Sequence, residues 1–180
     1  MLFRSERDNV HVFNSCFYSK LSQNFNPKTT RNWTKSVNIF EKDFVVLPVC
    51  HNDHWILIII RMVIPNLSIM VLDSANEKRV PRANVERTVK RYLEDEWCAK
   101  RSSQQELTFR DSRYAVVPQQ TNNTDCGVFL MKNFKEFIKS YPVEEPVWHK
   151  WRPVYGQKDI VALRKQIKVL IQKFSSESKS

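Results

Sequence analysis

Glycine is nearly absent from this chain: only Gly127 and Gly156 are glycines among its 180 residues. Neither belongs to a G-x-G-x-x-G or Walker pattern, which argues against a glycine-rich loop that holds nucleotide phosphates. Long apolar runs are also missing, since the run at residues 55–60 has the length of a strand and not of a membrane span. The charged first residues contain no apolar core of a secretory signal, so we expect no leader peptide.

Closely paired cysteines are missing as well. Cys16, Cys50, Cys98 and Cys126 lie far apart and form no C-x-x-C pair. That spacing excludes the usual zinc-knuckle pattern and indicates free thiols in a reducing compartment.

Basic residues outnumber acidic ones, with 29 Lys and Arg against 19 Asp and Glu and a net charge of +10. A basic surface attracts nucleic acid, anionic lipid or an acidic protein, and charge alone does not choose among them. A hydrophobic fraction of 42% with eleven phenylalanines indicates a packed core. The length suits a single domain.

Hydrophobic periodicity predicts strands in the middle of the chain with helices before and after them, which is an α+β arrangement. Asn84 is a candidate N-cap for one of these helices. The polar, proline-containing segment 22–32 is typical of a loop, and we expect the tail 175–180 to be disordered. The expected helices are residues 10–21, 84–97, 126–139 and 158–174.

Strands are expected where Val and Ile are dense. Two of them should form a hairpin about Pro65-Asn66, so that the start of one lies near the end of the other. The expected strands are residues 43–49, 54–63, 67–74 and the short 113–118.

Cys126 stands where one predicted helix begins, between Asp125 and Gly127. Unpaired backbone N–H groups at a helix N-terminus favour an anion, and so favour the nucleophilic thiolate over the thiol. Gly127 leaves room for a substrate backbone to approach closely. The alternative is a small buried residue at a helix start, because free cysteines are often buried.

A nucleophilic cysteine needs a base, and the base needs an orienting group. His54 opens one strand of the predicted hairpin and Asp73 closes the other, so both would lie at the same end of the sheet. Together with Cys126 they make a His–Asp–Cys set. Taken singly, His54 could be a histidine at a strand end and Asp73 a turn residue.

Acyl transfer also needs donors aimed at the developing oxyanion. Gln120, six residues before Cys126, could fold its side-chain amide over the thiol beside the Cys126 backbone N–H. Gln119 is the less favoured donor of the pair, and either glutamine could be a polar loop residue.

With these residues in order, the chain resembles the ubiquitin-like-protein-specific cysteine proteases, the sentrin (SUMO) proteases. The resemblance is carried by HW on one strand, LDS on the next, then PQQ and DCG. The segments HVFNSCFYSKL, RNWTKSVNIFEKDFVVLPV and RYLEDEW and the C-terminal helix are also similar to that family, over residues 10–173. The segment VPQQTNNTDCGVFL is most similar to the sentrin-specific protease six/seven, or yeast second-type, branch.

The resemblance implies a role for each matching residue. His54 of HW is the base, Asp73 of LDS orients its imidazole, Gln120 after PQ is the oxyanion donor, and Cys126 of DCG is the nucleophile. Trp55 matches the tryptophan that lines a narrow tunnel over the terminal Gly-Gly of the substrate. Judged from the residues without the resemblance, Trp55 could instead be an aromatic side chain in the core.

The resemblance also implies a papain-like cysteine protease fold of the SUMO protease type, with a central mixed sheet flanked by helices, over residues 1–174. Members of the family carry a Leu-Asn-Asp helix, often led by an aromatic, upstream of the segment that matches HVFNSCFY. This chain has no such motif after Met1. We therefore expect it to lack one tunnel wall and part of the substrate surface. The resemblance then does not imply that this chain is active by itself.

The implied activity is that of a thiol protease that cleaves after the C-terminal Gly-Gly of SUMO, mainly from isopeptide links to lysine, without a metal or other cofactor. The expected partner is SUMO or a SUMO-conjugated protein. We expect no membrane partner, and no nucleic acid as the primary ligand. We expect a monomer that is nuclear, or otherwise cytoplasmic.

Three alternatives remain. The chain could cleave another ubiquitin-like modifier such as NEDD8, or bind such modifiers without activity. It could also be a nucleic-acid-binding domain, which only the charge suggests. The set of His54, Asp73 and Cys126 argues against both non-enzymes.

Overall fold

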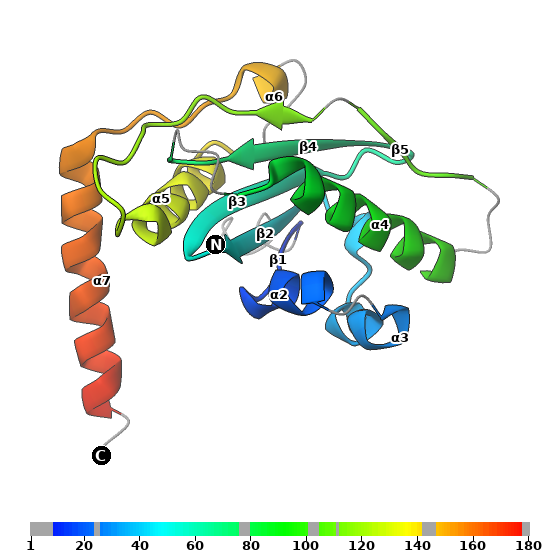
Figure 1. Ribbon diagram of the computed structural model, residues 1–180, viewed down its shortest axis with the longest axis horizontal. Coiled ribbons are helices and arrows are strands. Elements are labelled where there is room, and N and C mark those ends of the chain that lie inside the picture. The colour runs from blue at the N-terminus through cyan, green and yellow to red at the C-terminus, as the bar shows by residue number, and fades with distance from the viewer. Residues whose placement is uncertain are drawn as a thin grey trace, which may run out of the picture.

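A mixed β-sheet with helices on both faces forms the centre of the molecule (Figure 1). The computed structural model describes residues 9–23, 26–75, 80–100, 105–110, 112–141 and 147–177. The described strands follow the order β1-β2-β3-β4-β5, with β6 also paired to β4. The predicted α+β arrangement is therefore confirmed. The strands are β1 (Val10–Val12), β2 (Phe44–His51), β3 (His54–Arg61), β4 (Asn66–Leu72), β5 (Thr108–Phe109) and β6 (Arg113–Tyr114).

The helices divide between the two faces of the sheet. Helices α2 (Cys16–Gln23) and α4 (Arg82–Lys100) pack on one face, and α5 (Cys126–Lys139) packs on the other. Helix α7 (Gln157–Glu177) packs against α5 through Ile160 and extends away from the sheet (Figure 1). The shorter helical segments are α3 (Pro27–Thr30), η1 (Arg31–Thr34), η2 (Ile39–Glu41) and α6 (Val147–Lys150).

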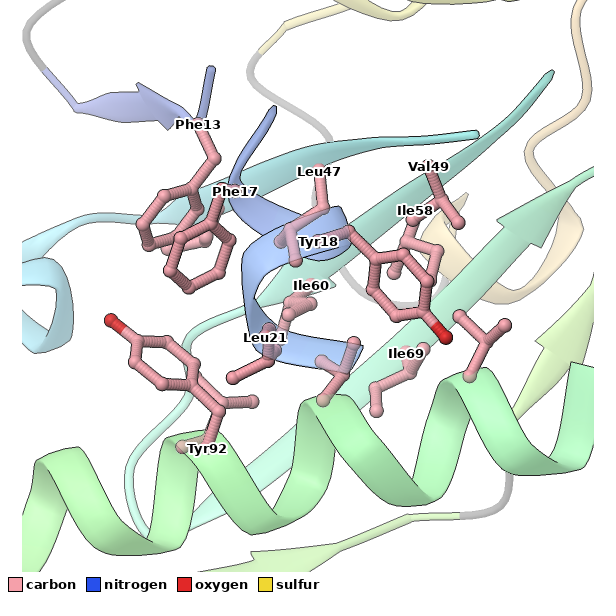
Figure 2. Close-up of a cluster of buried hydrophobic side chains, with 14 of the residues drawn as sticks. Phe13, Phe17, Tyr18, Leu21, Leu47, Val49, Ile58, Ile60, Ile69 and Tyr92 are labelled. Atoms are coloured by element: carbon pink, nitrogen blue, oxygen red, sulfur yellow. The ribbon is translucent and has the colours of Figure 1, made fainter. Parts of the chain in front are cut away.

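Strand β3 is buried on both faces, which explains its unbroken apolar run. Ile56, Ile58 and Ile60 belong to the cluster with α2 and α4. Leu57 and Ile59 belong to the cluster with α5, and all five residues are at most 1% exposed. A strand covered on both sides has no polar face, so its sequence does not alternate. Figure 2 shows the first cluster, with Phe13, Phe17, Tyr18, Leu21, Leu47, Val49, Ile58, Ile60, Ile69 and Tyr92 labelled.

The N-terminal segment differs from its prediction. Val10–Val12 form strand β1, paired in parallel with β2, and the helix begins only at Cys16. The prediction of one helix from residue 10 is wrong because the ladder with β2 holds the backbone of β1, a long-range contact that local periodicity does not show. Asn14 marks the change, since its side-chain oxygen accepts a hydrogen bond from Cys16 N at 2.8 Å.

Helix α4 begins earlier than predicted. Its first residue is Arg82, directly after Pro81, so Asn84 lies inside the helix and the prediction of Asn84 as N-cap is wrong. Proline has no backbone N–H to leave unpaired where a helix starts. The segment 22–32 is not a plain loop either, because it holds the end of α2, all of α3 and part of η1. The side chain of Asn26 caps α3, which local polarity alone did not indicate.

The C-terminal helix is longer than predicted. Helix α7 runs to Glu177, so the expectation of disorder is wrong for residues 175–177, and residues 178–180 lie outside the described residues. Lys173 and Glu177 lie 3.9 Å apart as an i,i+4 ion pair, which supports the last turn.

Both connections between the central strands are hairpins. The predicted hairpin of β3 and β4 is confirmed, with Leu57 opposite Leu72. The turn between β2 and β3 was not predicted. Its residues Asn52 and Asp53 take positive φ angles of 49° and 57°, which Asn and Asp tolerate and which suit a two-residue turn between twisted strands. This turn sets the start of β3 at His54.

The strand expected at residues 113–118 is shorter than predicted. Only Arg113–Tyr114 form β6, and Ala115 N then donates to Val71 O at 2.9 Å. Beyond this point the chain follows the end of β4 as a loop, where Gln120 N donates to Ser74 O at 2.8 Å.

Truncation at the centre of β3 tests the two-sided burial of this strand. Ile58 is 0% exposed, so Ile58→Ala loses buried methyl groups and leaves a cavity. We expect the free energy of unfolding in urea to fall by about 2–5 kcal/mol. Val154→Ala, at a residue 82% exposed, is the control and should change it by less than about 0.5 kcal/mol. Similar small losses in both variants would contradict the described core.

Candidate active site

The start of β3 and the end of β4 bring His54 and Asp73 together. Because the two strands pair antiparallel, the first residue of β3 lies near the residue that follows β4. His54 Nε2 lies 2.7 Å from Asp73 Oδ1, and the two side chains are only 1% and 4% exposed. The structure therefore places this predicted pair in hydrogen-bond contact.

This contact assigns the two nitrogens of the His54 ring. An ionised carboxylate can only accept, so Nε2 donates to Asp73 and the neutral ring keeps its lone pair on Nδ1. Nδ1 is buried and has no hydrogen-bond partner among the described residues. A buried acceptor in this state can take a proton from a neighbouring acid.

The Asp73 carboxylate is held by more than the histidine. Oδ1 also accepts from Ala75 N at 3.0 Å, and Oδ2 accepts from Arg82 Nε at 3.1 Å and Nη2 at 2.5 Å. Burial by itself raises the pKa of Asp73, but the hydrogen bonds from His54, Ala75 and Arg82 outweigh it and hold the pKa below its ordinary value. Asp73 is therefore ionised at neutral pH despite its burial.

Helix α5 begins at Cys126, as predicted, and side chains fix the loop before it. Asn122 Oδ1 accepts from the backbone N–H groups of Thr124 at 2.9 Å and Asp125 at 3.0 Å. The Asp125 carboxylate accepts from Asn122 Nδ2 at 2.7 Å and from Arg164 of helix α7. The hydrogen bond from Asn122, together with the Arg164 guanidinium, holds the pKa of Asp125 below its ordinary value. The C-terminal helix thus anchors the residue next to the thiol.

The Cys126 thiol lies against the turn that precedes His54. Its Sγ atom is 4.0 Å from Asp53 O, and the residue is 5% exposed. As the first residue of α5, Cys126 has a backbone N–H without a partner in the helix, and the positive end of the helix dipole favours a thiolate there. Gly127 lies beside Trp55, since a Cβ atom on this glycine would be 3.7 Å from Trp55 Cδ1. The thiol, the start of β3 and the indole therefore share one end of the sheet.

Gln119 and Gln120 are held differently in the loop after β6. Gln119 Nε2 donates to two backbone carbonyls, at 2.9 and 3.2 Å. Gln120 Oε1 accepts from Ser74 Oγ at 2.9 Å, and Gln120 Nε2 donates to one carbonyl, Asn122 O at 2.5 Å. An amide nitrogen carries two hydrogens. Within the described residues, Gln120 thus retains one N–H for a further acceptor, whereas both hydrogens of Gln119 are engaged.

Three residues that hold the site were not predicted from the sequence: Arg82, Asn122 and Arg164. Arg82 and Arg164 are 9 and 39 residues from the carboxylates they contact, and no local pattern links them. Asn122 did carry a signal, because asparagine before a helix favours side-chain hydrogen bonds to nearby backbone N–H groups.

Neither a metal centre nor a membrane span is found in the part of the chain that the structure describes. No three or more His, Cys, Asp or Glu side chains there gather closely enough to hold an ion. Over the same residues, every helix is too short or too polar to cross a bilayer. The four cysteines are free thiols, with Cys126 buried, Cys50 half-buried, and Cys16 and Cys98 exposed.

Residues 3–178 match the model of a known family, described as the Ulp1 protease family, C-terminal catalytic domain. Sentrin-specific protease 2 of Homo sapiens is 31% identical over 137 residues, which cover 74% of this chain and 22% of the human protein. A crystal structure of a de-sumoylating protease is 28% identical with a TM-score of 0.63, covering 74% of this chain and 53% of the other. The SUMO protease Ulp1, with its catalytic cysteine oxidized to a sulfenic acid, is 24% identical with a TM-score of 0.68. That match covers 93% of this chain and 70% of the other, and it supports the fold.

The chain spans about a fifth of the length of the human relative, 22%. The fold predicted from the resemblance, a mixed sheet flanked by helices in the SUMO protease arrangement, is confirmed. The matches do not assign the chain to the six/seven branch, so that assignment stays a prediction.

The buried carboxylate predicts how stability depends on pH. The folded pKa of Asp73 lies below the unfolded value of about 3.9. The stability that Asp73 contributes is therefore full above about pH 4 and is lost as the pH falls through the lower folded pKa. We expect Asp73→Asn to lower the free energy of unfolding by about 1–3 kcal/mol at neutral pH, because Arg82 and His54 lose their ionised partner. Denaturant titrations at decreasing pH should show this difference shrinking in acid.

Asp95→Asn is the control for this experiment. Asp95 pairs with Arg31 at 3.3 Å on the surface, where the side chains are 26% and 43% exposed. Such a pair contributes about 0–1 kcal/mol. An Asp73→Asn loss that is the same at pH 3 and at pH 7 would contradict a depressed pKa for Asp73.

Proposed function

The chain belongs to the Ulp1 protease family, and we propose that it is a cysteine-type isopeptidase that cleaves after the C-terminal Gly-Gly of SUMO. The observation that carries the proposal is the buried His54–Asp73 pair beside the turn that contacts the Cys126 thiol. The proposed roles are His54 as base, Asp73 as orienting carboxylate, Cys126 as nucleophile and Gln120 as oxyanion donor.

The substrate class is supported by the relatives. The human relative is named for its action on sentrin, and a solved structure at 28% identity is that of a de-sumoylating protease. The net charge of +10 also suits an acidic modifier. We therefore propose SUMO or SUMO-conjugated proteins as partners, and the nucleus as the place of action, which rests on the family alone.

The reaction begins with a proton transfer. His54 Nδ1, whose lone pair is unused among the described residues, takes the proton of Cys126 Sγ. The resulting imidazolium is stabilised by Asp73 through Nε2–H, and the thiolate by the N-terminus of α5. The proton transfer from Cys126 to His54 therefore needs little free energy before the substrate is attacked.

The thiolate then attacks the carbonyl of the terminal glycine. The carbonyl oxygen becomes an oxyanion, which accepts from the Cys126 backbone N–H and from the uncommitted N–H of Gln120. The imidazolium of His54 protonates the departing lysine amine, and a thioester remains on Cys126. Water, deprotonated by His54, hydrolyses the thioester and restores the thiol.

Trp55 and Gly127 suit a substrate that ends in two glycines. The indole lies beside Gly127 in the first turn of α5, and the missing side chain of this glycine leaves room for another backbone. We propose that the Gly-Gly backbone passes over Gly127 alongside the indole, where a side chain at either substrate position would meet the indole.

Covalent labelling tests the proposed function. A SUMO C-terminal vinyl-sulfone probe should label the wild-type chain at Cys126, and Cys126→Ser should abolish labelling and turnover while SUMO binding persists. The hydroxyl is nearly isosteric but far less acidic than the thiol. Cys16→Ser, at an exposed free thiol, is the control and should label like the wild type. Labelling by a NEDD8 probe alone would assign a different modifier, and reversible SUMO binding without labelling would indicate an inactive module.

The two glutamines separate oxyanion binding from loop anchoring. Gln120→Ala should lower kcat by about 10²–10³ and leave KM nearly unchanged, because the donor acts mainly on the transition state. Gln119→Ala is the matched control, since it also loses side-chain hydrogen bonds to the backbone of the site. It should cost much less on a fluorogenic SUMO C-terminal substrate. Equal, small effects would mean that the backbone N–H groups alone bind the oxyanion.

A further inference from the structure

The proposed mechanism uses only one of the two oxygens of Asp73. Oδ1 takes the hydrogen bond from His54 Nε2, whereas Oδ2 takes two hydrogen bonds from Arg82. We infer that Arg82 is a positioning residue for catalysis, which holds the Asp73 carboxylate so that Oδ1 faces the imidazole of His54. The inference rests on the proposed function, in which His54 is the base.

The donors around Asp73 fix the rotation of its carboxylate. The His54 ring and the Ala75 N–H hold Oδ1 at 2.7 and 3.0 Å, and the guanidinium of Arg82 holds Oδ2 at 3.1 and 2.5 Å. Turning the carboxylate would break bonds on both sides at once. Since the Asp73 side chain is only 4% exposed, water cannot readily replace a lost donor. Without Arg82, Oδ2 of Asp73 would have no donor among the described residues, and the carboxylate could turn away from His54.

Arg82 stands where a helix disfavours a cation. It is the first residue of α4, whose first turn holds no acidic residue, and the positive end of the helix dipole repels a guanidinium. The contact with Asp73 offsets that repulsion. The ring of Tyr114 on β6 makes a second contact with Arg82, a cation–π interaction in which the guanidinium carbon lies 5.2 Å from the ring centroid. Two contacts from different elements therefore place this side chain.

The other titratable groups near Asp73 do not substitute for Arg82. His54 on β3 changes its charge during turnover. Tyr114 on β6 is neutral, since burial raises its pKa, and Glu86 of α4 is an anion paired with Lys90 at 2.7 Å. A guanidinium does not lose its charge in proteins, so an arginine at this position can support the carboxylate in each step of the reaction.

Arg82→Gln tests the inference on a fluorogenic SUMO C-terminal substrate. We expect kcat to fall at least about tenfold and KM to change less than about twofold, because the base is misplaced while substrate binding persists. The acid limb of the pH profile of kcat should move to higher pH, since Asp73 loses a cation that favours its ionised form. Arg82→Lys keeps the charge but not the paired donors. The acid limb of Arg82→Lys should therefore lie where that of the wild type lies, and its kcat should fall between those of Arg82→Gln and the wild type.

Arg87→Gln is the matched control. It removes the same charge from the same helix, but Arg87 is exposed and contacts Asn84 at 3.4 Å. Its kcat and its acid limb should equal those of the wild type. The inference would be overturned if the kcat of Arg82→Gln fell only in proportion to its folded fraction, with the acid limb unmoved.

Proton NMR gives a readout that does not depend on turnover. The buried Nε2–H of His54 should give a protected, downfield resonance in the wild-type chain and in Arg87→Gln. Broadening or loss of this resonance in folded Arg82→Gln supports the inference, and an unchanged resonance overturns it. If the SUMO probe labels nothing, the proposed function fails, and this resonance still decides whether Arg82 positions Asp73 against His54.

Discussion

Asp73 keeps a negative charge inside the protein, and the arrangement of the site depends on how that charge is held. Moving a carboxylate out of water costs several kcal/mol unless hydrogen bonds and a counter-charge replace the lost water. Here the replacement comes from the His54 ring, the Ala75 backbone and the two nitrogens of Arg82. These groups belong to β3, the chain after β4 and the start of α4. The carboxylate is ionised and oriented only when all three elements are in place.

The sheet that carries these elements is rigid because it is buried on both faces. Strand β3 has Ile56 to Ile60 at most 1% exposed, with α2 and α4 on one side and α5 on the other. Helix α5 therefore packs on the same strand that begins with His54 and Trp55. The placement of Cys126 relative to His54 is therefore set by core packing and not by a flexible loop.

The C-terminal helix contributes to the site from outside the core. Arg164 of α7 contacts Asp125, the residue before Cys126, and Asn122 ties the same loop to its own backbone. Cys126 thus stands at a helix start that a separate helix supports. Such support suits the proposed reaction, in which the thiol meets an imidazole on a different element.

The sequence by itself determined the α+β class, the hairpin of β3 and β4, and the residues His54, Asp73, Gln120 and Cys126 as candidates, because strand pairing and helix starts leave local signals. It did not reveal strand β1, the turn at Asn52 and Asp53, or the anchors Arg82 and Arg164. Strand β1 and Arg164 rest on contacts between segments far apart in the chain, which no periodicity records. The turn and Arg82 are closer in sequence to their partners, but the Asn-Asp pair lacks the glycine that usually marks such a turn, and the contact of Arg82 follows no sequence pattern. Only the tertiary structure decided which nitrogen of His54 contacts Asp73, and which of two adjacent glutamines keeps an N–H. Both depend on where neighbouring acceptors lie in space.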